Sequence, residues 1–211
     1  MFFLFAFVPL ALAALTLASP LYSRQASGPC TGISGGYDSM YNFTLAAFNL
    51  TLPNANSTGA PLVVRFNQWT GSATASYFSA LSTYYSAHSN NEPTLSLVNG
   101  SLIPSNPADA DVSSTNLAVS ASSQLLFEFS TEESELPAPI QNYCIIDSPD
   151  SPYPILAVNG VTDAFSLCES DTPYYFGIPN DVMFQATEDN GHTYNYTSCY
   201  PVRLQVVYEQ A

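Results

Sequence analysis

The chain has 211 residues and a formal net charge of −14 at pH 7, with 17 Asp and Glu residues against 3 Lys and Arg residues. It has no lysine, and its basic residues are Arg24, Arg65 and Arg203. A chain this acidic repels phosphate backbones and anionic lipid surfaces, which argues against nucleic acid and membranes as partners of the mature protein. In an acidic medium the carboxylates would partly neutralise, so the composition favours an acidic exterior.

The N-terminus is almost wholly apolar over residues 1–18 and continues with Ala18-Ser19-Pro20. This pattern predicts a secretory signal peptide cleaved after Ala18, although a positive charge before the apolar run is lacking. Further trimming after Arg24 would leave a single secreted domain over residues 25–211. The alternative is a signal anchor that stays uncut. No second apolar stretch or hydrophobic tail follows, so we expect an extracellular protein.

The four cysteines are Cys30, Cys144, Cys168 and Cys199. An even number in a secreted chain predicts two disulfides, and three pairings are possible. We favour Cys168–Cys199, which lies in one closing region, together with Cys30–Cys144, which ties down the new N-terminus. A zinc site is the competing use of cysteine, but no Cys-x-x-Cys pair is present.

Short alternating segments separated by Pro, Ser and Gly predict an all-β fold, an antiparallel sandwich or barrel braced by disulfides with at most one or two short helices. In the last segment Val202, Leu204, Val206 and Tyr208 share one face, and Arg203 and Gln205 share the other. Asn159-Gly160 and Asn190-Gly191 are dipeptides that close tight hairpins. The other expected strands lie at residues 40–51, 62–67, 95–98, 125–130, 143–146, 155–158, 164–168 and 182–186.

Two segments are less regular. In 40–51, Tyr41, Phe43 and Leu45 share a face, but Phe48 and Leu50 have the opposite parity. This predicts a β-bulge or strand break at Ala46-Ala47, with Phe48 and Leu50 pointing inward. Residues 77–89 fit either a helix or two strands.

Five sequons predict surface glycosylation, since each is Asn-x-Ser/Thr without an intervening proline. They begin at Asn42, Asn49, Asn56, Asn99 and Asn195.

Three motifs together resemble the C-terminal β-domain of fungal PIR-type cell-wall mannoproteins and related secreted proteins, over roughly residues 95–207. They are Leu95-Ser96-Leu97-Val98-Asn99-Gly100-Ser101-Leu102, Phe165-x-Leu167-Cys168 and Cys199-x-Pro201-Val202-x-Leu204. The resemblance implies a compact disulfide-braced β-domain exported to the cell surface or medium. The family's glutamine-rich repeats are absent, so covalent linkage to wall glucan is not implied.

Catalytic signals are weak. His88 and His192 lack a Gly-x-Ser-x-Gly partner motif, and we interpret His192 as a solvated loop residue and His88 as a surface or boundary residue. Carboxylate pairs could hydrolyse glycosides, but most of the clustered acids lie in loops. These acids are Glu128, Glu132, Glu133, Glu135, Asp147 and Asp150. Asp109-Ala110-Asp111 lacks the glycine and distal glutamate of a calcium loop, so we expect neither a metal nor a cofactor.

Aromatic side chains offer a different chemistry, because exposed rings can stack on sugars. Trp69, Tyr174 and Tyr175 are the candidate carbohydrate-stacking residues, and the competing interpretation is that such rings fill the core. Trp69 shares parity with Arg65 and Asn67, the polar face of its expected strand.

The leading hypothesis is therefore a non-enzymatic secreted glycoprotein of the cell-wall or surface class, with wall polysaccharide as its candidate partner. The alternatives are an extracellular polysaccharide-active enzyme that uses a carboxylate pair, and a secreted interaction protein.

Overall fold

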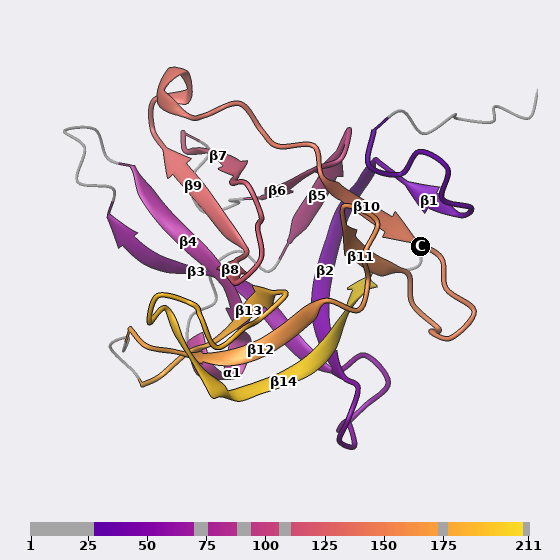
Figure 1. Cartoon of the computed structure of the whole chain (residues 1–211). Coiled ribbons are helices and arrows are strands. Elements are labelled where there is room, and N and C mark those ends of the chain that lie inside the picture. The colour runs from indigo at the N-terminus through magenta and orange to yellow at the C-terminus, as the bar shows by residue number, and fades with distance from the viewer. Residues whose placement is uncertain (1–27, 70–75, 88–93, 106–110, 173–176, 209–211) are drawn as a thin grey trace, which may run out of the picture.

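The computed structural model describes residues 28–69, 76–87, 94–105, 111–172 and 177–208, and these form strands and loops with very little helix (Figure 1). The elements are β1 (Gly36–Tyr37), β2 (Met40–Asn49), β3 (Ala60–Trp69), β4 (Tyr77–Thr83), α1 (Tyr84–Ala87), β5 (Leu95–Val98), β6 (Ser101–Pro104), β7 (Ser113–Asn116), β8 (Ser123–Gln124), β9 (Leu126–Ser130), the 3-10 turn η1 (Glu133–Glu135), β10 (Tyr143–Ile146), β11 (Ile155–Val158), β12 (Phe165–Ser170), β13 (Asn180–Phe184) and β14 (Tyr194–Val207).

Six of the described strands close an antiparallel ring. Around it the order is β2, β3, β4, β13, β12 and β14, and β14 pairs with β2 to complete the circuit. Additional strands extend from this barrel: β5 and β6 from β2, β7 and β9 from β4, β8 from β13, and β11, β10 and β1 from β14. The predicted all-β antiparallel fold with little helix is thereby confirmed.

The core lies on one face of the barrel strands and is shared with the added strands. Alternate residues contribute to it, as a pleated strand requires. Burial of each Leu, Val or Phe side chain contributes about 1.5–3 kcal/mol. Its buried members include Leu45 from β2, Leu62 and Val64 from β3, Leu81 from β4, Phe127 and Phe129 from β9, Tyr143 from β10, Val158 from β11, Phe165 and Leu167 from β12, Val182 from β13, and Val202, Leu204 and Val206 from β14.

The segment 77–89 matches neither predicted alternative in full, because its described part is one strand followed by one helical turn. Residues 77–83 form β4, which pairs with β3 along its length, and one short helical turn, α1, follows. Beyond Ala87 the segment lies outside the described residues.

The predicted irregularity in β2 is real but was placed wrongly. Residues 44–49 pair with β14 without interruption, so there is no slip at Ala46-Ala47. The register shift falls between Met40 and Phe43, where Asn42 has a φ of 55°. Leu50 is 40% exposed rather than inward, because it lies beyond the strand in the loop to β3.

The Asn-Gly turns are present, but they do not close the hairpins predicted for the end of the chain. Asn159 and Gly160 both have positive φ and close a tight turn after β11. The next strand, β12, pairs with β13 and β14 instead of β11. Asn99-Gly100 does join paired neighbours, β5 and β6.

The disulfides are Cys30–Cys144 and Cys168–Cys199, the pairing that the sequence analysis favoured. All four cysteines are therefore oxidised, which is typical of an oxidising, extracellular-type compartment. In the described parts of the chain, no helix has both the length and the apolar character needed to cross a membrane.

Two side chains at the end of β14 differ from expectation. Gln205 was predicted on the solvent face, but it is buried, because loops cover that face: its side chain donates to the Ser57 carbonyl and accepts from Ser151. Tyr208 was predicted inward but is 41% exposed, because β14 ends at Val207.

Candidate functional site

A large β-bulge, with several extra residues, interrupts the first half of β14. The strand pairs Tyr200 with Leu167 and Asn195 with Glu169, so four residues of β14 lie opposite Cys168 alone. Bulges of this kind bend a strand and redirect side chains. Here the bulge, residues 196–199, carries Tyr196 to the surface, where it is 39% exposed.

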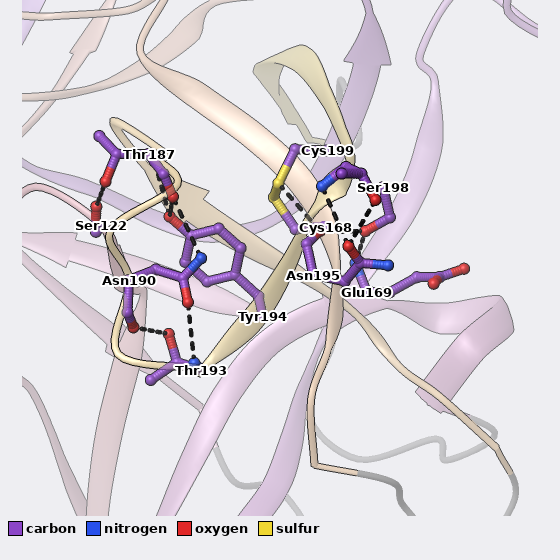
Figure 2. Close-up of a disulfide and its surroundings, with 11 residues drawn as sticks. Ser122, Cys168, Glu169, Thr187, Asn190, Thr193, Tyr194, Asn195, Ser198 and Cys199 are labelled. Carbon is purple, nitrogen blue, oxygen red and sulfur yellow. Dashed lines mark hydrogen bonds between the residues drawn. A yellow bond between two sulfur atoms is a disulfide. The ribbon is translucent and has the colours of Figure 1, made fainter.

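The bulge is held at both ends (Figure 2). The disulfide joins Cys199 to Cys168 on β12. Ser198 Oγ accepts from the Glu169 backbone N–H at 2.8 Å and donates to the Asn195 carbonyl at 2.6 Å. The Asn195 side-chain oxygen accepts from the Thr197 N–H and hydroxyl, at 3.1 and 2.7 Å. These contacts fix Tyr196 between two anchored neighbours.

The loop from Thr187 to Thr193 is ordered by side-chain hydrogen bonds rather than by strand pairing. The buried Tyr194 hydroxyl accepts from the Thr187 N–H at 2.8 Å and donates to the Thr187 carbonyl at 3.0 Å (Figure 2). Asn190 donates to that same carbonyl, and its side-chain oxygen accepts from Thr193 N–H. Ser122 also hydrogen-bonds the Thr187 hydroxyl. The exposed Glu188 and His192 are thus presented on a fixed scaffold.

Two adjoining hollows lie beside the bulge, and we call them together the bulge groove. They share Glu188 and Tyr196 as lining residues and have volumes of about 310 and 400 Å³. The first is also lined by Asp171, Asn190, His192, Tyr194 and Asn195. The second is also lined by Ser166, Ala186, Thr197, Cys199 and Pro201.

The chemistry of this groove is polar, acidic and aromatic. Carboxylates, amides and hydroxyls supply hydrogen-bond acceptors and donors, and Tyr196 supplies an exposed ring. No Lys or Arg is among the described lining residues. The groove therefore repels anionic ligands and suits a neutral ligand rich in hydroxyls.

The predicted stacking residues do not help to define this site. Tyr174 and Tyr175 lie outside the described residues. Trp69 is the last residue of β3, where its backbone pairs with Tyr77, but its side chain is not among the parts that the structure describes.

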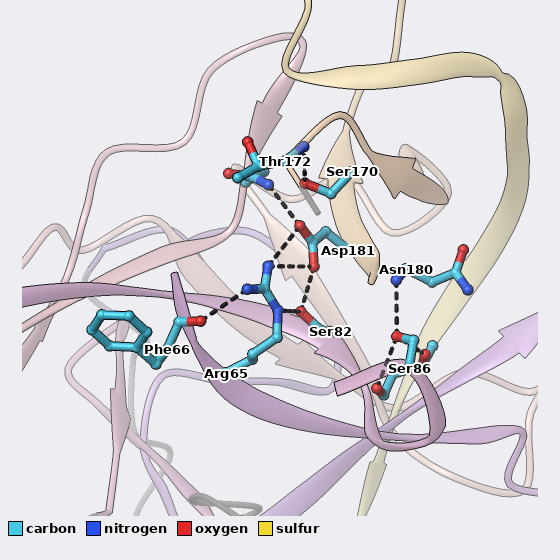
Figure 3. Close-up of polar contacts among 10 residues, drawn as sticks. Arg65, Phe66, Ser82, Ser86, Ser170, Thr172, Asn180 and Asp181 are labelled. Atoms are coloured by element: carbon cyan, nitrogen blue, oxygen red, sulfur yellow. Dashed lines mark hydrogen bonds and ion pairs between the residues drawn. The ribbon is translucent and has the colours of Figure 1, made fainter. Parts of the chain in front are cut away.

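The face of β3 that carries Arg65 was expected to be polar and exposed, but it is buried at Arg65. Arg65 is 2% exposed and contacts both carboxylate oxygens of Asp181, each at 3.1 Å (Figure 3). Its Nε donates to Ser82 Oγ at 3.1 Å, and Ser82 in turn donates to Asp181. Gln124 donates to the other Asp181 oxygen at 2.7 Å. Arg65 is thus the centre of a buried polar network on the face of β3 opposite the main core.

The acids singled out from the sequence lie apart from the bulge groove. Glu132, Glu133 and Glu135 are exposed around η1, and Glu133 lines a separate hollow of about 230 Å³ beside β7. Asp147 accepts a 2.7 Å hydrogen bond from Tyr37, which raises the pKa of that tyrosine. The Asp150 backbone carbonyl accepts from Arg203.

Glu128 is the one acid of that set on a strand, as predicted, and it is half-buried on β9 opposite Thr115 and Phe78. Burial raises its pKa above the ordinary value of 4.5.

Metal-binding candidates do not gather. His192 is exposed in the loop before β14, as the sequence suggested, whereas His88 and Asp109 lie outside the described residues. Within the described ranges, no three His, Cys, Asp or Glu side chains are close enough to hold a metal ion.

The sequon asparagines are all at least partly exposed. At Asn49, Asn56 and Asn195 the side-chain oxygen accepts from the N–H and the hydroxyl of the threonine two residues on. Asn42 and Asn99 instead have positive φ, at the β2 irregularity and in the β5–β6 turn.

Sequence reasoning missed Tyr196, Glu188 and Asp171 as neighbours. The available signal was the run Tyr194–Tyr200, in which polar residues and tyrosines break the alternation that begins at Val202. That break in the alternation indicates a bulge, but it does not predict which loop of the protein lies beside the bulge.

Searches against protein-family models, curated proteins and solved structures find no match to this chain.

Proposed function

We propose that this protein is a secreted, non-enzymatic glycoprotein of the cell-wall or cell-surface class that binds neutral polysaccharide in the bulge groove. The observation that carries the proposal is the exposed Tyr196 ring, fixed by the bulge beside the carboxylates and amides that line the two hollows.

Each part of the groove suits a sugar. The face of a tyrosine ring packs on the C–H groups of a pyranose, while carboxylate and amide groups pair with its hydroxyls. The volumes of about 310 and 400 Å³ fall within the range of small-ligand sites. Because the Thr187–Thr193 loop is already hydrogen-bonded, little conformational entropy is lost on binding.

The export and surface parts of the proposal have separate support. The apolar N-terminal segment, five sequons and two disulfides are features of exported glycoproteins. The resemblance of residues 95–207 to the β-domain of fungal PIR-type wall proteins supports a location at the cell surface.

The test is binding of the secreted protein to insoluble β-glucan, chitin and mannan and to an array of neutral glycans, before and after enzymatic release of its N-glycans. Tyr196→Ala should weaken binding about tenfold, equivalent to about 1.4 kcal/mol. Tyr41→Ala is the matched control, because Tyr41 is 66% exposed and lines neither hollow. Absence of binding in every form, or equal losses in both variants, contradicts the proposal.

One observation favours the enzymatic alternative: Asp171 and Glu188 line the same hollow. A pair of carboxylates can cleave a glycosidic bond if one donates a proton and the other attacks or activates water. Release of reducing ends that stops in Glu188→Gln, while binding persists, would support this candidate. Unchanged polysaccharide after prolonged incubation would exclude it for the substrates tested.

A further inference from the structure

The bulge groove contains a glycosylation sequon in its own wall. Asn195 lines the same hollow as Asp171, Glu188 and Tyr196, and the sequon Asn195-Tyr196-Thr197 begins at the edge of the bulge. Asn195 is exposed, so an attached glycan would meet no buried structure. The attachment point and the proposed ligand site therefore coincide.

The bulge also fixes the direction of this side chain. The Asn195 side-chain oxygen accepts two hydrogen bonds from Thr197, at 3.1 and 2.7 Å, so the amide plane cannot turn freely. The amide nitrogen, which lies in the same plane and is bonded to the same carbon as the oxygen, is the atom that carries an N-linked glycan. Because Asn195 and Tyr196 line the same hollow, the first sugars of such a glycan would lie within reach of it.

A tethered sugar has a strong advantage over a free one. Linkage through a short connection gives an effective concentration in the millimolar range, whatever the concentration in solution. The first hollow, of about 310 Å³, is at the small end of ligand sites, so a tethered glycan that fills it would displace an external chain from that hollow and from the Tyr196 ring that both hollows share.

We infer that an N-linked glycan on Asn195 occupies the bulge groove as a tethered ligand and excludes external polysaccharide. The fraction of chains without this glycan then sets the binding capacity of the secreted protein. This inference rests on the proposed function, since it assigns a regulator to the same groove.

Asn56 provides the matched control. Its side-chain oxygen accepts from the Thr58 N–H and hydroxyl, at 3.1 and 2.9 Å, which is the arrangement found at Asn195. It lies in the loop between β2 and β3 and lines neither hollow of the groove.

The experiment compares wild type, Asn195→Gln and Asn56→Gln, each secreted from a glycosylating eukaryotic host and each measured before and after enzymatic release of its N-glycans. The polysaccharide is the best binder found with the N-glycan-free protein, and mass spectrometry reports the occupancy of Asn195. Asn195→Gln, which removes the glycan, and wild type after N-glycan release should both bind about tenfold more tightly than untreated wild type. Asn56→Gln should bind as wild type does, and adding Tyr196→Ala to Asn195→Gln should abolish the gain.

An unoccupied Asn195 in the secreted wild type, or equal affinities of wild type and Asn195→Gln, overturns the inference. If those equal affinities are both weakened by Tyr196→Ala, the proposed function stands and only the regulation falls. If no variant binds with or without glycans, the proposed function itself fails.

Discussion

At the scale of single residues, the buried Arg65–Asp181 pair is the feature with the largest consequence for stability. The two side chains are 2% and 0% exposed, and Ser82 and Gln124 complete the hydrogen bonding of the carboxylate. Removing one partner of a buried pair leaves the other charge without compensation in a medium that solvates it poorly.

We therefore expect Asp181→Ala to lower the free energy of unfolding by about 3–5 kcal/mol. The control is Asp163→Ala, because Asp163 is a largely exposed partner of Arg203 at 3.8 Å and such pairs contribute about 1 kcal/mol or less. Urea denaturation of both variants measures the difference. Equal, small losses would show that the network does not stabilise the fold.

Glu128 is the residue with a defined pH effect. Burial raises its pKa in the folded state above the ordinary value of 4.5, so folding favours the protonated form. Burial of this carboxyl therefore costs no stability below the ordinary pKa of 4.5, where it is protonated in both states, and the free energy of unfolding falls as the pH rises through the folded pKa and the buried group ionises.

In Glu128→Gln the side chain at this position is neutral at every pH. We expect the variant to match wild type at pH 3.5 and to unfold at a higher temperature than wild type at pH 7. Thermal denaturation across this range tests the sign, with the exposed Glu132→Gln as control. A variant less stable than wild type at pH 7 would contradict it.

At the scale of elements, the start of β3 depends on one glycine. Gly59 has a φ of +90°, and a Cβ atom there would lie 2.3 Å from the Ala47 carbonyl oxygen on β2. The close approach lets Ala60 pair with Ala47 as β3 joins the barrel.

We expect Gly59→Ala to cost about 3 kcal/mol or more, because the left-handed strain adds to a backbone clash. Gly32→Ala is the control: Gly32 has a φ of +81° but nothing within 4 Å of the new Cβ, so only the strain of about 1 kcal/mol applies. Chemical denaturation of both variants measures the loss in free energy of unfolding. Similar losses would show that the backbone of β2 shifts at little cost to accommodate the new Cβ atom.

At the scale of the whole molecule, the two disulfides close loops of different size and hold different parts. Cys30–Cys144 spans 114 residues and fastens β10 to the N-terminal segment of the described chain, whereas Cys168–Cys199 spans 31 residues and fastens the bulge.

In the chain-entropy model the two bridges stabilise by about 4.8 and about 3.7 kcal/mol, respectively. We expect Cys30→Ala/Cys144→Ala to be the less stable double variant in denaturation, yet to retain the proposed saccharide binding. Cys168→Ala/Cys199→Ala should lose binding as well as stability, because the bulge is no longer held. Equal binding by the two double variants would show that the bulge is not part of the proposed ligand site.

The sequence predicts the class of this fold better than its connections. Alternation identifies strands such as β9 and the end of β14, because a strand with one buried face has period two. It does not identify neighbours: β12 lies between β13 and β14, although turn signals favoured hairpins. The interpretation of Arg65 was wrong for a similar reason, since Asp181 is 116 residues away in the chain.

The candidate site was less predictable still. Cys168 and Cys199 were paired correctly, and Asn195 was identified as a sequon. The approach of Asp171 and Glu188 to Tyr196 comes from a bulge and a loop that belong to different strand connections. The period of apolar residues along a strand cannot predict that these three side chains lie close together.

The pairing of β2 with β14 that closes the ring also sets the order of events during biosynthesis. Residues 44–49 leave the ribosome more than 150 residues before their partners, residues 202–207. At the 5–20 residues per second of translation, the barrel stays open for roughly 8–30 seconds. Under the proposed export, Thr44, whose hydroxyl finally donates to the Val207 carbonyl, would be available to the glycosylation machinery during that interval as part of the Asn42 sequon. Modification at Asn42 would thus compete with ring closure, whereas the exposed Asn195 sequon lies in the last strand of the ring to be synthesised.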